Sequence, residues 1–197
     1  RGGDPLPAGN TWVLPGYSHG EAVERLRGDP LVEDTVLFIS FASAKDPTYG
    51  ERHPGLQSCQ VCAPAFYGPV EAYASRRVKK RGKEYQDLKE RIKGNMLKGL
   101  LREFPQLEGR VGYADVGTAV TNDHYLGTTR GAIYGLPHTP ARFRARWLRA
   151  DTPIGGLYLS GQDVLTCGIM GAAYAGMLTC CSMSWEFARG TAGRFLG

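Results

Sequence analysis

The chain has 197 residues, enough to bury a sizeable core in one domain or two, and its 24 Lys and Arg against 19 Asp and Glu give a net charge of +5. This excess is moderate, and its densest part, residues 76–81, has no interleaved aromatic side chains of the kind that bind single strands. We therefore interpret the run as the solvated end of a helix and expect no nucleic-acid partner.

The five cysteines are odd in number and lie in apolar stretches, which favours reduced thiols over a disulfide framework. Cys59 and Cys62 have the spacing of a metal or redox pair. They lie in a stretch that we predict to be extended, where residues three apart point to opposite faces, and no second pair accompanies them. The sequence therefore predicts no metal site.

The N-terminal part contains one catalytic motif. Residues 1–10 are turn-forming and are predicted to be a linker, and residues 11–14 a short strand. Gly-Tyr-Ser-His-Gly then matches the G-x-S-x-G elbow of serine hydrolases around Ser18, and residues 21–27 have a helical pattern. A strand, a tight turn and a helix are the context that such an elbow requires.

The hydrolase interpretation is limited by what surrounds the motif. Fifteen residues precede it, too few for the sheet strands that come before an elbow. A triad in the chain order Ser, Asp, His would join Ser18 to Asp115 or Asp123 and then to His138. A serine hydrolase that uses Ser18 stays an alternative.

The middle of the chain alternates between strand and helix patterns. Residues 35–41 and 57–63 are predicted strands, the first rich in β-branched and aromatic residues. Residues 83–104 are predicted to form one long helix, because apolar residues recur at spacings of three and four until Pro105. Residues 110–116 alternate weakly and are predicted to be a third strand.

Residues 121–140 are predicted to be a loop dense in Gly, Tyr and His. Aromatic residues between glycines can line a pocket for a long apolar molecule, and they also occur in ordinary turn packing. Both interpretations stay open for this loop.

The last third has the most distinctive order of residues. Residues 156–160 form a short apolar run bounded by glycine, which predicts a buried strand. Gly161 then suits a tight turn, because it can adopt backbone angles that larger residues cannot, and Asp163 stands at a predicted helix N-cap or faces a ligand. Residues 164–185 are uncharged and long enough to cross a membrane, but their small and polar residues favour a buried helix.

Three glycines in this helix, Gly168, Gly171 and Gly176, need a compensating reason, because each costs about 1 kcal/mol relative to alanine in a helix interior. A flat ligand lying close to the helix start is one reason, and tight packing against a sheet is the other. The complete order of elements predicts a mixed α/β fold without internal repeats.

Several stretches together resemble the C-terminal half of the retinol saturase group, flavoproteins related to phytoene desaturases and carotenoid isomerases. They are Phe-Ile-Ser-Phe-Ala-Ser-Ala-Lys-Asp-Pro at 38–47, Arg-His-Pro-Gly at 52–55, and residues 104–109, 121–135 and 156–176. The resemblance implies the C-terminal part of an FAD-dependent two-domain oxidoreductase. Residues 11–149 would be a substrate-binding portion with a mixed sheet, and residues 150–197 a strand and helix completing the FAD domain. The chain lacks the G-x-G-x-x-G turn with which that domain begins, so we expect a fragment of a longer protein.

The same resemblance implies roles for particular residues. The cofactor-binding residues would lie at the ribityl chain and pyrophosphate and at the flavin ring; they are Gly161, Gln162 and Asp163, and Gly168, Ile169, Met170 and Gly171. Tyr125 and Tyr134 would line the substrate channel. Tyr134 and His138 would be catalytic as candidate proton donors, with local hydrogen bonding as the alternative for His138.

The activity implied is saturation of a double bond in a polyene such as all-trans-retinol. A carotenoid isomerase or phytoene desaturase is the nearest alternative, and a non-catalytic binding module is a more distant one. The implied partners are FAD, a hydrophobic polyene and a membrane surface, with NAD(P)H as a possible electron donor. The implied location is the endoplasmic reticulum, or alternatively a plastid. We expect the fragment alone to be inactive.

Overall fold

The computed structural model describes residues 6–195, and the chain divides into two units, Arg1–Gly131 and Ala132–Gly197. It contains both helices and strands, so the mixed α/β class is confirmed. The sequence placed a boundary between residues 149 and 150, between the substrate-binding portion and the part that would complete the FAD domain. This division by role stays a prediction.

The first unit contains a small antiparallel sheet of three strands in the order β1, β2, β3. The strands are Thr11–Val13, Leu37–Ser40 and Gln60–Cys62, so the strands predicted at 11–14, 35–41 and 57–63 are confirmed in shorter form. Phe38 at the centre of β2 pairs with Trp12 on one side and Cys62 on the other. Because both pairings are antiparallel, the mixed sheet expected here is wrong for the described residues.

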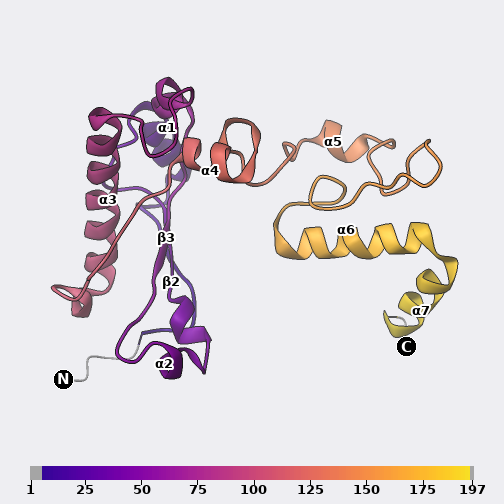
Figure 1. Ribbon diagram of the computed structural model, residues 1–197, viewed down its shortest axis with the longest axis horizontal. Helices are drawn as coiled ribbons and strands as arrows, with labels where there is room; N and C mark the ends of the chain where they lie inside the picture. Colours follow the sequence, from indigo (N-terminus) through magenta and orange to yellow (C-terminus); the bar gives the residue numbers. More distant parts are fainter. Residues whose placement is uncertain (1–5, 196–197) are drawn as a thin grey trace. The chain divides into compact units, whose positions relative to one another are not determined.

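One long helix, α3 (Lys83–Glu103), runs alongside β2, as Figure 1 shows. Its predicted extent, 83–104, is confirmed to within one residue, because Phe104 is the C-cap. The main core forms where the two elements meet, and its buried members are Leu37, Ile39, Phe41, Leu100 and Phe104. Phe41 and Phe104 meet edge to face with ring centroids 4.9 Å apart. The side chains that alternate along β2 and those on one face of α3 thus contribute to the same buried cluster from two sides.

Short helical segments connect these elements. The α-helices are α1 (His19–Gly28), which confirms the helix predicted at 21–27, and α2 (Tyr49–Arg52). The 3-10 segments are η1 (Ala42–Lys45), η2 (Gly68–Tyr73), η3 (Pro105–Leu107) and η4 (Thr129–Gly131).

Two predictions for the end of this unit are wrong. Residues 110–116 form no strand, because their side chains are mostly exposed and no described strand pairs with them. Part of the predicted loop is a helix, α4 (Ala119–Leu126). A capping box of Thr118 and Thr121 begins α4, and Gly127 ends it in the left-handed region at φ 65°. A second buried cluster of Val70, Tyr85, Ala119 and Val120 packs this helix against η2 and α3.

The second unit contains three helices in its described residues: α5 (Pro140–Arg144), α6 (Gly168–Met183) and α7 (Trp185–Phe195). The predicted strand at 156–160 is wrong, because Tyr158 makes only an isolated bridge to Asp151. Leu157 and Leu159 are 48% and 41% exposed, so the apolar run is not buried among the described residues.

The predicted helix at 164–185 begins later, at Gly168, with Cys167 at its N-cap, so the N-cap assignment of Asp163 is wrong. The buried character expected of this helix is also wrong in this chain, because only Gly171 and Ala175 are buried along α6. None of the helices in residues 6–195 is both long and apolar enough to span a membrane.

Candidate functional site

Hydrogen bonds join two segments of the second unit that are distant in sequence, residues 133–138 and 161–167, which we call the paired loop. Asp163 Oδ1 accepts a hydrogen bond from the Leu136 N–H over 2.8 Å, and Gln162 Nε2 donates to the Ile133 carbonyl over 3.2 Å. Gly135 lies at φ 65°, and a Cβ there would collide with the Asp163 carboxylate. The loop and the turn that the sequence singled out separately therefore form one structure.

Arg142 holds the two segments of the paired loop together. Its Nη1 donates to the Leu136 carbonyl over 2.7 Å. Its Nη2 donates to the carbonyls of Gln162 and Asp163 over 2.7 Å and 3.2 Å. The side chain is buried although it is charged.

The start of α5 places Arg142 where it can make these contacts. Thr139 caps the helix by accepting from the Arg142 N–H over 3.3 Å, and Pro140 occupies the first turn. Sequence reasoning missed Arg142. The Thr-Pro pair was a readable signal for a helix start, but nothing in the sequence distinguishes Arg142 from the neighbouring Arg144, Arg146 and Arg149.

His138 connects the paired loop to the start of α6. Its Nε2 lies 3.1 Å from the Cys167 N–H, which donates to it, and 3.2 Å from Thr166 Oγ1. A nitrogen that accepts a backbone N–H carries no proton, so a neutral His138 ring has its proton on Nδ1. The structure therefore places His138 in local hydrogen bonds, and its role as a proton donor stays a prediction.

Glycines shape the approach to α6. Gly161 and Gly168 lie at φ 94° and 88°, which confirms the unusual backbone angle expected of Gly161. A Cβ on Gly171 would collide with the carbonyl group of Thr166, so this glycine permits tight packing, although against the chain's own turn rather than a sheet. Gly176 has open space around its Cα, and the structure gives no reason for it.

The first turn of α6 is open to a ligand. It contains no acidic residue, and Ile169 and Met170 are 88% and 64% exposed. The first N–H groups of a helix have no acceptors within it, and its dipole favours negative charge there. Asp163 lies close to this turn in sequence and is exposed, and its Oδ2 has no partner among the described residues. The arrangement offers donors to an anion, a carboxylate to a hydroxyl group and apolar side chains to a ring.

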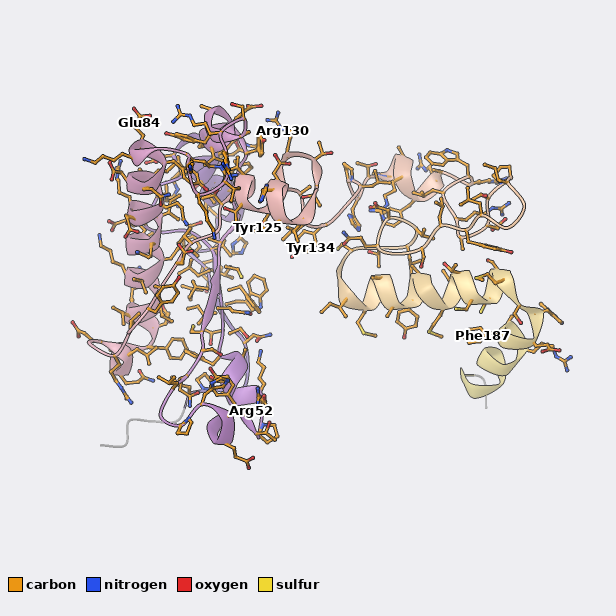
Figure 2. The ribbon with its side chains drawn as sticks, viewed as in Figure 1. Arg52, Glu84, Tyr125, Arg130, Tyr134 and Phe187 are labelled. Atoms are coloured by element: carbon orange, nitrogen blue, oxygen red, sulfur yellow. The ribbon has the colours of Figure 1, made fainter. Side chains whose placement is uncertain are left out.

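The two tyrosines predicted to line a channel belong to different units and are labelled in Figure 2. Tyr125 lies on α4, is 63% exposed and has its ring 4.8 Å from that of His124. Tyr134 precedes α5 and is 60% exposed. Their role at a substrate stays a prediction.

The candidate aspartates of the alternative triad are hydrogen-bonded to other residues. Ser18 is exposed at the start of α1. Lys89 donates to Asp115 over 2.9 Å and lowers the pKa of that carboxyl group. Tyr67 donates to Asp123 over 2.9 Å, a bond that raises the pKa of the phenol. Neither aspartate is hydrogen-bonded to a histidine among the described residues, and these residues contain no group of side chains that could hold a metal ion.

No protein-family model and no solved structure matches the chain. It is 38% identical over 174 residues to an all-trans-retinol 13,14-reductase of Danio rerio, covering 87% of this chain and 28% of that protein. It is likewise 38% identical over 180 residues to the protein of the same name from Homo sapiens, covering 88% and 30%. An inactive all-trans-retinol 13,14-reductase of Danio rerio is 32% identical over 146 residues, or 73% of this chain and 24% of the relative. The chain thus spans less than a third of these relatives.

Proposed function

We propose a function for this chain from the premise that it is homologous to part of the all-trans-retinol 13,14-reductases, as its motifs predicted. The complete protein would be an FAD-dependent oxidoreductase that saturates one double bond of a polyene such as all-trans-retinol. The 38% identity over 87% of the chain is the observation that carries this proposal.

The paired loop and the start of α6 would form part of the FAD site. Gly161, Gln162 and Asp163 would lie along the ribityl chain and pyrophosphate, where the exposed carboxylate can accept from a hydroxyl group. Residues 168–171 would approach the flavin ring with the N-terminus of the helix, which favours negative charge there. The exposed side chains of Ile169 and Met170 would cover apolar parts of the cofactor.

Saturating a double bond requires a hydride on one carbon, which reduced FAD supplies when bound, and a proton on the other. Of the two candidate donors, Tyr134 is favoured by its exposed side chain. His138 already accepts a backbone N–H at Nε2, so it would have to donate from Nδ1.

The remaining assignments rest on the resemblance alone. A hydrophobic polyene would contact Tyr125 and Tyr134, and a membrane surface, at the endoplasmic reticulum or in a plastid, would present it. NAD(P)H would reduce the flavin. A carotenoid isomerase or desaturase is the second candidate from the same group. One relative, at a lower identity of 32%, is named as inactive, and it introduces a third candidate, a homologue without reductase activity.

The visible absorption spectrum of the complete purified protein tests this proposal. We expect flavin bands, and Asp163→Ala should weaken FAD binding about tenfold, because it removes an acceptor for a hydroxyl group. Asp151→Ala is the matched control, since Asp151 is an exposed aspartate of the same unit that pairs with Arg149. A colourless protein that takes up no added FAD would overturn the proposal.

Product analysis then separates the candidates. The protein is incubated with all-trans-retinol and with carotenoids, once with its flavin reduced and once with it oxidised, and the products are identified by mass. A gain of two hydrogens with the reduced protein indicates a reductase, an unchanged mass with a new retention time indicates an isomerase, and a loss of two hydrogens with the oxidised protein, whose FAD accepts them, indicates a desaturase. Flavin binding without any product would indicate an inactive homologue.

A further inference from the structure

Arg142 is a buried cation that carbonyl oxygens surround. Its side chain is 9% exposed, and its described acceptors are three backbone carbonyls of the paired loop. Its Nη1 also lies 3.3 Å from both ring nitrogens of His138. Among the residues whose side chains are described, 6–190, no carboxylate lies within ion-pair distance of it. The charge of this guanidinium is therefore not neutralised by an acid in this part of the chain.

The contacts use the shape of a guanidinium group. Its two Nη atoms point to different segments, Nη1 to Leu136 and Nη2 to Gln162 and Asp163. Arginine holds several donors in one rigid plane, whereas the donors of a lysine share a single nitrogen. A lysine at this position retains the charge but cannot bridge the two segments in the same way.

We propose that Arg142 is the positioning residue of the candidate flavin site, which fixes the turn at residues 161–163 against residues 136–138 so that Asp163 and the start of α6 present a preformed surface to the cofactor. This inference rests on the proposed function. Arg142 acts through the backbone of the residues that would touch FAD, and its positive charge adds to that of the helix N-terminus in favouring an anionic ligand.

The test compares FAD affinity among variants of the complete protein. Arg142→Lys and Arg142→Ala should each raise the FAD dissociation constant about tenfold or more, because hydrogen bonds of a charged donor to both segments are lost. Arg144→Lys and Arg144→Ala are the matched controls, since Arg144 is an exposed arginine on the same short helix, and they should stay within about twofold of the parent. Thr139→Ala, which removes only the cap that orients Arg142, should weaken binding by a smaller factor.

Three readouts separate positioning from a general loss of folding. Far-UV circular dichroism and the melting temperature of the FAD-free protein should be close to the parent values in Arg142→Lys. Hydrogen exchange should become faster within residues 133–138 and 161–167 and stay unchanged in the first unit. Millimolar methylguanidinium should restore FAD affinity to Arg142→Ala but not change that of Arg144→Ala.

The outcomes distinguish this inference from the function on which it rests. A parent that binds FAD, together with an Arg142→Lys variant of parental affinity, overturns the positioning role and leaves the flavoenzyme proposal standing. A loss of affinity accompanied by a lower melting temperature and faster exchange throughout the protein also overturns it. A parent that binds no FAD overturns both.

Discussion

At the scale of single residues, Cys59 illustrates how surroundings decide chemistry. Its partial desolvation, with a smaller effect of the neighbouring Cys62 thiol, raises its pKa from the ordinary 9.0 to about 11. The Cys59 thiol is therefore protonated at neutral pH, and Cys59 supplies little of the thiolate that redox exchange requires. Because the folded-state pKa is raised, this group contributes stability below pH 9.0 that is lost as the pH rises through about 11.

This shift predicts slow alkylation of Cys59. At pH 8, iodoacetamide should modify Cys59 about a hundredfold more slowly in the folded protein than in the urea-unfolded chain, because the thiolate fraction falls tenfold per pKa unit. The measurement is the time course of modification of the peptide containing Cys59, followed by mass spectrometry. The folded-state rate should keep rising up to about pH 11. Equal rates in the folded and unfolded chains would contradict the assigned environment.

At the scale of elements, the contact of α3 with β2 depends on one glycine. Gly99 is buried on α3, and a Cβ there would collide with the side chain of Leu37. Leu37 is itself 1% exposed in the core and has little room to move. Gly94, five residues earlier on the same helix, would place a Cβ in open space. Both glycines lie within the same predicted helix, so the sequence does not distinguish them, but their surroundings in the structure differ.

Alanine at the two positions should therefore have different effects on stability. Gly94→Ala should raise the free energy of unfolding by about 1 kcal/mol, because alanine is the better helix former. Gly99→Ala gains the same helix propensity but overpacks the core, which costs about 1–3 kcal/mol, so its net effect should be neutral to destabilising. Urea unfolding of both variants measures the difference. A Gly99→Ala variant as stable as Gly94→Ala would show that Leu37 moves aside without cost.

At the scale of the whole molecule, the two units differ in how much they bury. Both buried apolar clusters belong to Arg1–Gly131. In the described part of Ala132–Gly197, the buried apolar residues are Ala150 and Ala175. Large apolar side chains are exposed there instead, among them Trp147, Ile154, Ile169, Met170 and Trp185. Figure 2 shows side chains projecting from α6. Since burial of apolar surface drives folding, the first unit holds most of the stability.

The two units should therefore behave differently when they are expressed alone. Residues 1–131 should unfold cooperatively in urea, whereas residues 132–197 should show no cooperative transition, because two buried alanines supply little apolar burial. Circular dichroism at 222 nm against urea concentration makes the comparison. A sharp transition in residues 132–197 alone would show that the second unit has a sufficient core of its own.

Local patterns were enough to predict the elements whose structure depends on the chain nearby. The helical spacing of apolar residues in 83–104 correctly predicted α3, and the apolar run at 35–41 correctly predicted β2. Each pattern gives its element one apolar face, whichever partner that face packs against. The start of α4 was also readable, since Thr118 and Thr121 form a capping box, but the glycines and aromatic residues around it favoured a loop. The motifs around residues 38–47 and 156–176 were sufficient to predict homology to part of the all-trans-retinol 13,14-reductases, which the comparison confirms.

The contacts between residues distant in sequence were decided only by the tertiary structure. The apolar run at Leu157–Leu159 has the composition of a buried strand, but a strand exists only where another strand pairs with it, and none is described there. Asp163 was singled out, but its bond to Leu136 and the bridging role of Arg142 join positions that no local pattern connects. Sequence by itself determined the periodic elements and the partial homology, because periodicity and motifs are local properties. The antiparallel sheet, the paired loop and the arginine that holds it were decided by tertiary structure, because each depends on which distant backbone groups satisfy one another's hydrogen bonds.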